Sequence, residues 1–375
     1  MSCHGDTRRS SYLPISRTAG SNLPPGAGES LAHCELVPDP AHRIMLVVRI
    51  IAVLNQKGGV GKTTTVANLG AAVASRGRDI CLIDLDPQAH LTLHFGLDPG
   101  TTETSIYEVL TADATIASAA ATVSPHLSLV PSTIDLAAAE VELASTVGRE
   151  QLLRDQVLAA VLPYEFVMID CPPSLGLLTL NALAAADEVC IPLQPHFLAL
   201  QGLGKLLETV ALVQKRINAR LRVTGVVLCM YDSTTRLTAE VEADVKNFIG
   251  RARNADTPWS HMRLFETVIR RNVKLAECPS HGKSIFDYEP NCHGAKDYNA
   301  LADEFLGMID GAAAAEPQAP RAEQPEKLTN ETPQGKPVAA SAASGAAPAH
   351  IDGADGSATA SCGTVAPDGP TGEQP

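Results

Sequence analysis

The sequence lacks several features that would suggest a function at once. None of its nine cysteines forms a CxxC pair, so a zinc ribbon is not expected. No uninterrupted apolar run approaches the roughly 18 residues of a membrane-spanning helix. Basic side chains are in deficit, with 29 Lys and Arg against 42 Asp and Glu. The resulting net charge of −13 argues against a general nucleic-acid coat.

What is present suits a folded domain with flanking segments. Hydrophobic residues make up 45% of the chain, enough for a sizeable core. Residues 1–44 have little apolar periodicity and no secretory h-region, so we expect a disordered extension or an artefact of an early start codon. Residues 312–375 have nine prolines, and three basic against eight acidic side chains, a net of −5. That composition predicts a disordered, acidic tail, which leaves 45–311 as the folded domain.

Within 45–311, short β-branched runs alternate with longer helical patterns. This alternation predicts βαβ units and an α/β fold, a mostly parallel twisted sheet with helices on both faces. Such sheets bind ligands outside the carboxyl ends of their strands. The predicted strands are 47–54, 80–84, 127–131, 165–170, 187–192 and 222–230, and the predicted helices are 62–76, 134–146, 149–162, 176–186, 198–218, 237–250 and 294–310.

A glycine-rich segment follows the first predicted strand and precedes a helix, the order found in phosphate-binding loops. Gly58, Gly59 and Gly61 allow backbone N–H groups to approach phosphate oxygens without a Cβ in the way. The helix that starts near Lys62 adds its N-terminal dipole. Lys62 can reach the β- and γ-phosphates, and the Thr63 hydroxyl can ligate Mg²⁺.

The loop departs from the usual pattern at two positions. Gln56 stands where the pattern requires glycine, and Lys57 adds a second cation beside the loop. One interpretation is a solvated surface lysine. The functional interpretation is a positive charge offered to the nucleotide of a neighbouring subunit, in the manner of an arginine finger.

Three aspartates at strand ends could complete a phosphoryl-transfer site. Asp170 ends the apolar run EFVMID, where a carboxylate can face the phosphate loop and hold Mg²⁺ through water, although a helix-capping role is the alternative. Asp84 and Asp86 stand two residues apart after the run ICLI. Residues i and i+2 of a strand share a face, so both carboxylates can point at the nucleotide.

Several of these segments together carry a family resemblance. KGGVGKTT (57–64) resembles the deviant Walker A motif of the ParA/MinD family of P-loop ATPases. IDLDPQ (83–88) and IDCPPS (169–174) resemble the second and third motifs of that family. Residues 265–290 resemble the C-terminal region of chromosomal ParA proteins of the Soj type.

The resemblance implies a site as well as a fold. The expected activity is slow, partner-stimulated ATP hydrolysis with ATP and Mg²⁺ as cofactors. Asp86 is expected to orient the attacking water, and Asp84 to support the metal or the switch. The resemblance implies catalytic roles for Lys57, Lys62 and Asp86, metal contacts from Thr63 and Asp170, and nucleotide contacts from Lys57, Gly58, Gly59, Val60, Gly61, Lys62, Thr63, Thr64, Asp84, Met230 and Asn272.

A local basic cluster suggests a DNA-binding surface in spite of the acidic chain. Eight basic and three acidic side chains lie between Lys246 and Lys283, a local charge of +5. No helix-turn-helix signature is present, so binding to the phosphate backbone without sequence specificity is expected. A solvated charged face is the alternative. The resemblance implies DNA contacts from Arg236, Arg270, Arg271 and Lys274, although Thr234 replaces an arginine that is frequent in those proteins.

The expected function is therefore an ATP-dependent switch. The resemblance implies a homodimer formed with ATP, non-specific DNA, a ParB-like stimulatory protein and a cytoplasmic, nucleoid-associated location. A MinD-like membrane switch would need a basic amphipathic C-terminal helix, and residues 312–375 contain no such helix pattern. A tyrosine autokinase would need a tyrosine-rich tail, and residues 312–375 contain no tyrosine. An adaptor that binds ATP without turnover is disfavoured because the expected catalytic residues are present. Residues 1–44 are too few for an operator-binding domain.

Two other groups of residues are interpreted as structural. Cys171 follows Asp170 directly, but no second cysteine stands in a comparable loop, so a catalytic thiol or iron–sulfur ligand is disfavoured. His90 and His94 are four residues apart near the expected switch, and we interpret them as ordinary surface or packing residues.

Overall fold

The computed structural model describes residues 48–160, 162–253 and 256–315. The predicted extension 1–44 lies outside the described residues. Of the predicted tail, only 312–315 is described, and it continues a helix. Three-dimensional statements below concern the described residues.

A mostly parallel sheet forms the centre of the domain and confirms the predicted α/β fold. Its order is β3-β4-β2-β5-β1-β6-β7-β8, with β9 beside β7. Only the β3–β4 pair is antiparallel among the described pairings. The strands are β1 (Arg49–Val53), β2 (Ile80–Asp84), β3 (Ala121–Ser124), β4 (Leu127–Val130), β5 (Phe166–Asp170), β6 (Glu188–Leu193), β7 (Arg222–Tyr231), β8 (Arg263–Leu264) and β9 (Ile269–Arg270).

All six predicted strands are present, and each predicted helix corresponds to one helix or to a helix with a short 3₁₀ extension. The last helix runs to Ala315, five residues beyond its predicted end. The helices are α1 (Lys62–Ala74), α2 (His90–His94), α3 (Ile106–Thr111), α4 (Ile116–Ala119), α5 (Leu136–Glu142), α6 (Leu152–Ala159), α7 (Leu177–Ala185), α8 (Ala199–Arg216), α9 (Arg236–Ala252), α10 (Val273–Glu277), α11 (Ile285–Tyr288) and α12 (His293–Ala315).

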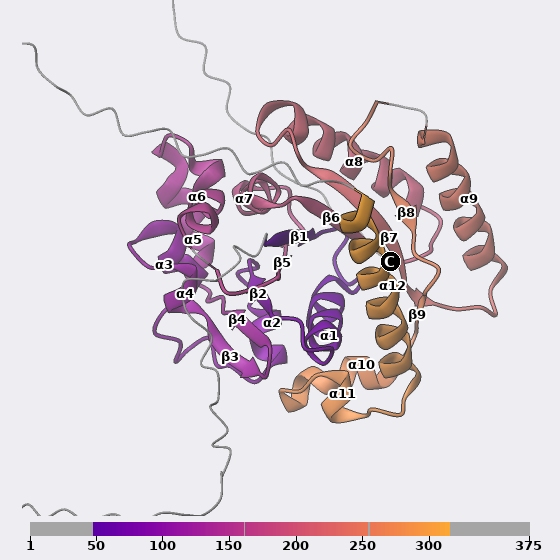
Figure 1. The fold of residues 1–375 in the computed structure, drawn as a ribbon, viewed down its shortest axis with the longest axis horizontal. Helices are drawn as coiled ribbons and strands as arrows, with labels where there is room; N and C mark the ends of the chain where they lie inside the picture. Colours follow the sequence, from indigo (N-terminus) through magenta and orange to yellow (C-terminus); the bar gives the residue numbers. More distant parts are fainter. Residues whose placement is uncertain (1–47, 161, 254–255, 316–375) are drawn as a thin grey trace, which may run out of the picture. The chain divides into compact units, whose positions relative to one another are not determined.

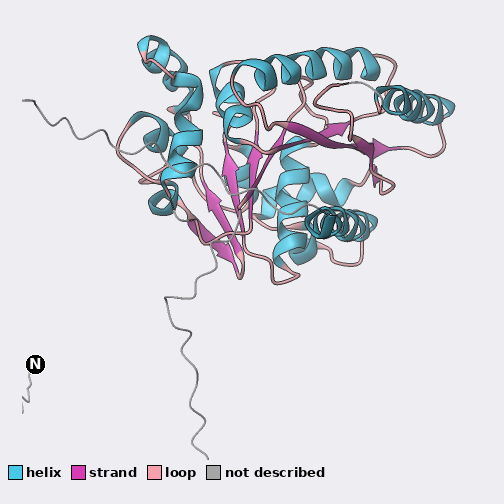
Figure 2. Cartoon of the chain, turned by 45° about the horizontal axis from the view of Figure 1, so that its top comes forward, coloured by secondary structure: helices cyan, strands magenta, loops and turns pink. Residues whose placement is uncertain are grey.

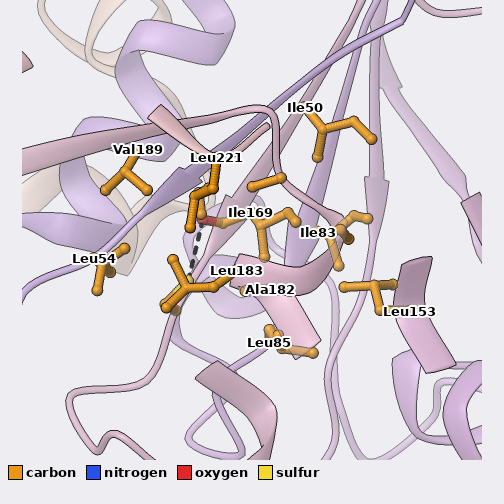
Figure 3. Packing of buried hydrophobic residues seen from close by; sticks show 14 of the residues in the cluster. Ile50, Leu54, Ile83, Leu85, Leu153, Ile169, Ala182, Leu183, Val189 and Leu221 are labelled. Atoms are coloured by element: carbon orange, nitrogen blue, oxygen red, sulfur yellow. Dashed lines mark hydrogen bonds between the residues drawn. The ribbon is translucent and has the colours of Figure 1, made fainter. Parts of the chain in front are cut away.

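Helices cover both faces of the sheet, as Figure 2 shows, and each face has its own apolar core. The alternation of side chains along a strand divides β1 between the two: Ile50 and Ala52 pack under α3 and α5–α9, and Ile51 and Val53 pack under α1 and α12. Figure 3 shows part of the first core. On the second face α1 and α12 lie side by side (Figure 1).

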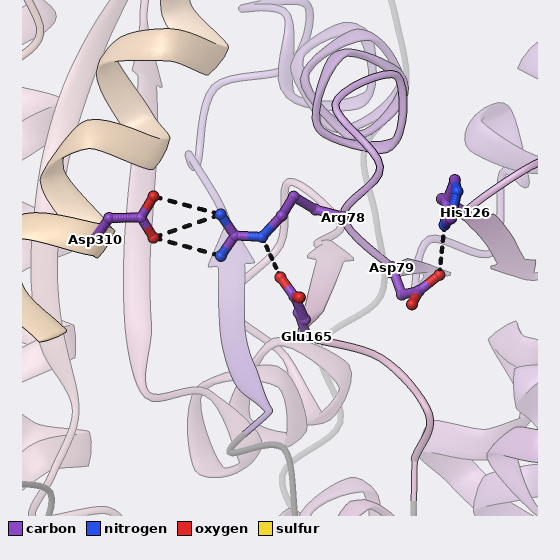
Figure 4. Close-up of polar contacts among 5 residues, drawn as sticks. All are labelled: Arg78, Asp79, His126, Glu165 and Asp310. Atoms are coloured by element: carbon purple, nitrogen blue, oxygen red, sulfur yellow. Dashed lines mark hydrogen bonds and ion pairs between the residues drawn. The ribbon is translucent and has the colours of Figure 1, made fainter. Parts of the chain in front are cut away.

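Ion pairs fasten the amino-terminal edge of the sheet. Arg78, just before β2, pairs with Glu165, just before β5, and with Asp310 of α12 (Figure 4). Asp79 Oδ1 also lies within hydrogen-bond distance, 2.8 Å, of His126 Nδ1 in the loop before β4. This edge is therefore occupied by structural contacts, which leaves the opposite, carboxyl-terminal edge for ligands. No helix in the described part of the chain combines the length and apolar character that a bilayer crossing requires.

Candidate nucleotide-binding site and basic surface

The carboxyl ends of three adjacent strands bring the predicted site together. β5 lies between β2 and β1, and its last residue, Asp170, is in register with Asp84 of β2 and with Val53 of β1. Because the strands are parallel, the loop after β1 begins at the same edge. The glycine-rich loop and two of the three predicted aspartates, Asp84 and Asp170, thus meet at one edge of the sheet.

The backbone of the loop is shaped to receive an anion. Gly59 and Gly61 have φ angles of 72° and 94°, values that L side chains rarely adopt. Gly61 is the N-cap of α1 and supplies no side-chain cap, so the first N–H groups of the helix remain available. A Cβ on Gly58 or Gly59 would meet nothing within 4 Å. The loop therefore has open space beside both glycines.

Thr63 and Asp170 form the centre of the predicted magnesium site. The Thr63 hydroxyl donates to Asp170 Oδ2 at 2.6 Å, and Asp170 is 1% exposed. The other oxygen, Oδ1, is buried without a hydrogen-bond partner among the described residues. A hydroxyl beside a carboxylate with a spare oxygen is the kind of oxygen donor set that Mg²⁺ and its bound waters prefer. Thr63, Asp170 and the nucleotide's own phosphates can hold the ion, so these residues fit it.

The electrostatics of this edge also favour a cation. Burial raises the pKa of Asp170 well above its usual range, and the negative charge of Asp84 raises it further. Burial likewise raises the pKa of Asp84 to about 6, although hydrogen bonds from Thr92 and the Asp86 amide oppose this. Lys62, 7% exposed, is the cation whose charge lowers the pKa of Asp170. A bound metal ion would relieve the repulsion between these buried carboxylates.

Asp84 and Asp86 have different surroundings despite their spacing. Asp84 is fully buried; its Oδ2 accepts from the Thr92 hydroxyl and amide at 2.7 and 2.8 Å. Its Oδ1 accepts from the Asp86 amide at 3.3 Å. β2 ends at Asp84, and Asp86 stands beyond it in a partly exposed loop, where its Oδ1 accepts from the Gln88 amide at 3.0 Å. Of the two roles expected for Asp84, these contacts favour support of the switch loop.

Lys57 is exposed at the outer rim of the loop. Its Nζ lies 3.3 Å from Gln194 Oε1, in the segment after β6, and its amide donates to Asn55 Oδ1 at 3.0 Å. The Asn55 side chain in turn donates to the carbonyl of Pro192 at 2.7 Å. The backbone of Lys57 is thus fixed to the end of β6 through Asn55, and its Nζ makes an exposed hydrogen bond to the segment after that strand. Gln194 was missed by the sequence prediction because nothing in its spacing distinguishes it.

Met230 and Asn272, the two remaining predicted nucleotide contacts, lie at the end of β7 and at the start of α10. Met230 has a φ of 52°, a left-handed value, where the β7–β9 register shifts. The residue before it, Cys229, would lie 3.7 Å from a Cβ on Gly61, so β7 ends against the phosphate loop. Asn272 caps α10, its side chain accepting from the Lys274 amide at 2.8 Å. Nucleotide contact by either residue stays a prediction.

The cysteine and histidine side chains near the site are structural. Cys171 is fully buried, and burial raises the pKa of its thiol, so the reactive thiolate is suppressed. His94 is buried at 1% exposure beside Phe95, and burial lowers its pKa to about 4. No cluster of three or more His, Cys, Asp or Glu suited to a metal ion occurs among the described residues.

The four predicted DNA-binding residues stand at or after the carboxyl ends of β7 and β9: Arg236 begins the helix that follows β7, Arg270 ends β9, and Arg271 and Lys274 follow it. The Arg271 amide donates to the Tyr231 carbonyl at 3.2 Å, and both Arg236 and Arg271 are exposed. Arg270 instead pairs with Asp297 of α12, with Nε 3.0 Å from Oδ2.

Two more basic side chains of the cluster are paired within the chain. Lys274 pairs with Glu277 at 2.8 Å and stands over the Tyr288 ring. Lys246 pairs with Glu242 at 2.6 Å. The sequence window of +5 overstates the local charge, because Asp297 and Glu242 lie outside it. Arg236 and Arg271 are therefore the stronger candidates for contact with a phosphate backbone.

Comparison with known proteins agrees with this geometry. Residues 48–223 match the AAA_31 family model, an AAA domain. The chain is 45% identical over 257 residues to the sporulation initiation inhibitor protein Soj of Bacillus subtilis, covering 68% of this chain and 97% of Soj. It is 42% identical over 262 residues to the chromosome partitioning protein ParA of Caulobacter vibrioides, covering 69% and 94% of the two chains.

Solved structures show the same fold. A cobyrinic acid a,c-diamide synthase from Mycobacterium smegmatis, with a bound ATP analogue and magnesium, is 37% identical with a TM-score of 0.60, covering 71% of this chain and 97% of that one. The cell division ATPase MinD of Pyrococcus furiosus is 25% identical with a TM-score of 0.55, covering 69% and 99%. The chain therefore belongs to the ParA/MinD family of deviant Walker A P-loop ATPases and stands with its Soj-type chromosome-partitioning members.

Proposed function

We propose that this ATPase is a dimerising switch that binds DNA without sequence specificity while ATP is bound and dissociates from the DNA after hydrolysis. Its cofactors are ATP and Mg²⁺, and its general role is the positioning of a cargo within the cell. The observation that carries the dimer is the position of Lys57, exposed at the rim of the phosphate loop with its Nζ in an exposed hydrogen bond to Gln194. Such a lysine is well placed to reach a nucleotide held by a second copy.

The chemical step depends on positioning more than on covalent chemistry. Water attacks the γ-phosphorus as the bond to the β–γ bridging oxygen breaks, so charge builds up on the phosphate oxygens. Bound Mg²⁺ neutralises part of that charge. Lys62 and the loop amides bind the phosphates, Thr63 and Asp170 orient the metal, and Asp86, partly exposed beyond β2, orients the attacking water.

Exposed apolar side chains support a dimer through the same edge. Large exposed apolar groups can mark an interface when several lie along one edge of a sheet. Four of them follow the carboxyl ends of β4, β5 and β6, where a second nucleotide-bound copy would cover them. They are Ile134, 67% exposed, Leu175, 38% exposed, Phe197, 84% exposed, and Leu198, 55% exposed.

Replacing Lys57 tests the dimer. We expect Lys57→Ala to retain ATP binding but to lose both ATP-dependent dimerisation, measured by size-exclusion chromatography with light scattering, and hydrolysis. Lys205→Ala, at an exposed lysine of α8, is the matched control. Dimerisation and turnover at the wild-type level in Lys57→Ala would refute the action of Lys57 across the interface.

Charge reversal tests the DNA surface. Arg236→Glu and Arg271→Glu together should abolish DNA binding and leave ATP-dependent dimerisation intact, because both side chains are exposed. Lys215→Glu and Arg216→Glu together, at exposed residues in the last turn of α8, are the control: they make the same charge change at the opposite edge of the sheet. Lys274→Glu should cost less, because Lys274 is already paired with Glu277. Loss of dimerisation along with DNA binding would indicate a fold defect.

A ParB-like protein is the proposed stimulatory partner, and nucleoid association is the proposed location. Both follow from similarity to proteins named for chromosome partitioning. Adding such a partner should accelerate ATP hydrolysis and release the protein from DNA. If DNA fails to bind in every nucleotide state, the MinD-like alternative becomes the better one, and pelleting with anionic liposomes would test it.

A further inference from the structure

A buried hydrogen-bonded chain holds the loop that follows β2. It begins at Asp84 Oδ2, which accepts from the Thr92 hydroxyl at 2.7 Å. The same hydroxyl accepts from the Ser132 amide at 2.9 Å, and the Ser132 hydroxyl donates to the carbonyl of Asp86 at 2.8 Å. Asp84, Thr92 and Ser132 are each 0% exposed. The chain thus joins the ends of β2 and β4 to α2 and terminates on the backbone of Asp86.

The backbone of Asp86 is fixed on both sides by these contacts. Its amide donates to Asp84 Oδ1 at 3.3 Å, and its carbonyl accepts both from Ser132 and from the Ala89 amide at 2.9 Å. Ala89 itself has a φ of 53°, a left-handed value that costs a non-glycine residue free energy and persists only where surrounding contacts impose it. The loop is therefore held in one specific conformation.

We propose that Ser132 and Thr92 are positioning residues for ATP hydrolysis, which hold the backbone of Asp86 so that its carboxylate stays on the attacking water. The proposal rests on the proposed role of Asp86. Ser132 acts through the Asp86 carbonyl, and Thr92 acts by fixing Ser132 and Asp84 relative to one another. A displacement of about 1 Å at a group that orients a reactant can cost on the order of a hundredfold in rate.

The adjacent residue provides a matched control. The Thr133 hydroxyl is buried like that of Ser132, but it has no hydrogen-bond partner among the described residues. Thr133→Val removes a buried hydroxyl one residue away without breaking the chain. Thr92 offers a second comparison, because Thr92→Val keeps the side-chain volume and loses the hydroxyl, whereas Thr92→Ser keeps the hydroxyl.

The test compares turnover with binding. Single-turnover hydrolysis of ATP with Mg²⁺ should fall at least about tenfold in Ser132→Ala and Thr92→Val, while the Kd for a non-hydrolysable ATP analogue stays within about twofold of wild type. Thr92→Ser and Thr133→Val should turn over like the wild type. Because binding is retained, the slow variants should accumulate an ATP-bound dimer, which a simple packing defect would not produce. Unchanged turnover, or equal losses of binding and turnover, would overturn the proposal.

Asp86→Ala, measured in parallel, distinguishes a failure of the positioning role of Ser132 and Thr92 from a failure of the role proposed for Asp86. If Asp86→Ala turns over like the wild type, the proposed role of Asp86 is wrong and the positioning role fails with it. If Asp86→Ala is inactive while Ser132→Ala and Thr92→Val are unaffected, the role of Asp86 stands and only the positioning chain is refuted.

Discussion

Replacing Asp170 by Asn should stabilise the nucleotide-free protein while it destroys the magnesium site. The wild-type carboxylate is 1% exposed, has one unpartnered oxygen and lies beside the buried Asp84. Asn removes the charge but keeps an oxygen that can accept from the Thr63 hydroxyl. Burying a poorly compensated carboxylate costs several kcal/mol, and Lys62 offsets part of this, so we expect a gain of about 2 kcal/mol.

Thermal unfolding with EDTA and without nucleotide measures this gain, which corresponds to a rise in Tm of about 4–8 °C for a domain of this size. Because burial raises the folded-state pKa of Asp170, the native wild type retains a proton that the unfolded chain has released. Wild-type stability therefore falls as pH rises from the unfolded pKa through the folded pKa. The advantage of Asp170→Asn should be small near pH 5 and larger near pH 8.

Binding of Mg²⁺ and ATP should reverse the order of stability of the wild type and Asp170→Asn. Mg²⁺ and ATP at about a hundred times Kd should stabilise the wild type by about 2.7 kcal/mol and the variant far less, because the variant lacks the charge that holds the metal. Without nucleotide, Asp170→Asn is expected to be more stable than the wild type. With saturating Mg²⁺ and ATP, the wild type is expected to be more stable than the variant. A variant that is less stable than wild type in EDTA at every pH would refute the argument that this site is maintained at a cost in stability.

Two further predictions concern the core. His94 is buried, and its pKa is lowered from 6.5 to about 4, so wild-type stability is lost as pH falls through this window. The free energy of unfolding of wild type relative to His94→Leu should fall by about 3 kcal/mol between about pH 7 and pH 4 in urea titrations, and a pH-independent difference would contradict this. Gly225→Ala places a Cβ 2.9 Å from the Arg263 carbonyl oxygen and 2.7 Å from Phe265 Cε2, so it should lower the free energy of unfolding by about 1–3 kcal/mol. Gly250→Ala in α9 places a Cβ with nothing within 4 Å and should raise the free energy of unfolding by about 0.5–1 kcal/mol. Equal effects of the two substitutions on Tm would refute this prediction.

The sequence predicted the central strands and the phosphate loop because both have strong local signals. β1, β2 and β5 are short runs of β-branched and apolar residues, and the glycines of the loop have conformations that few other residues adopt. The two-residue strands β8 and β9 were not predicted, because two residues show no periodicity and pair only through contacts with β7.

The features of the site that the sequence did not predict depend on tertiary contacts. The spacing of Asp84 and Asp86 predicted that both carboxylates lie on one face of a strand. Instead, β2 ends at Asp84, whose carboxylate accepts a hydrogen bond from the buried Thr92 hydroxyl. Ser132, two residues beyond the end of β4, contacts the Asp86 carbonyl, although the two residues are 46 positions apart in the chain. The pairing of Arg270 with Asp297 likewise joins β9 to α12, which a charge count over a sequence window cannot detect.

The central claim is that ATP binding creates a DNA-binding dimer. The most direct test is co-sedimentation of the purified full chain with DNA of unrelated sequences, in the presence of ATP, of ADP or of no nucleotide, at low and at moderate salt. We expect binding only when ATP is present, equal for all DNA sequences and weaker as salt rises, since the proposed contacts are to phosphate. Equal binding in all three nucleotide states, or none in any, would contradict it.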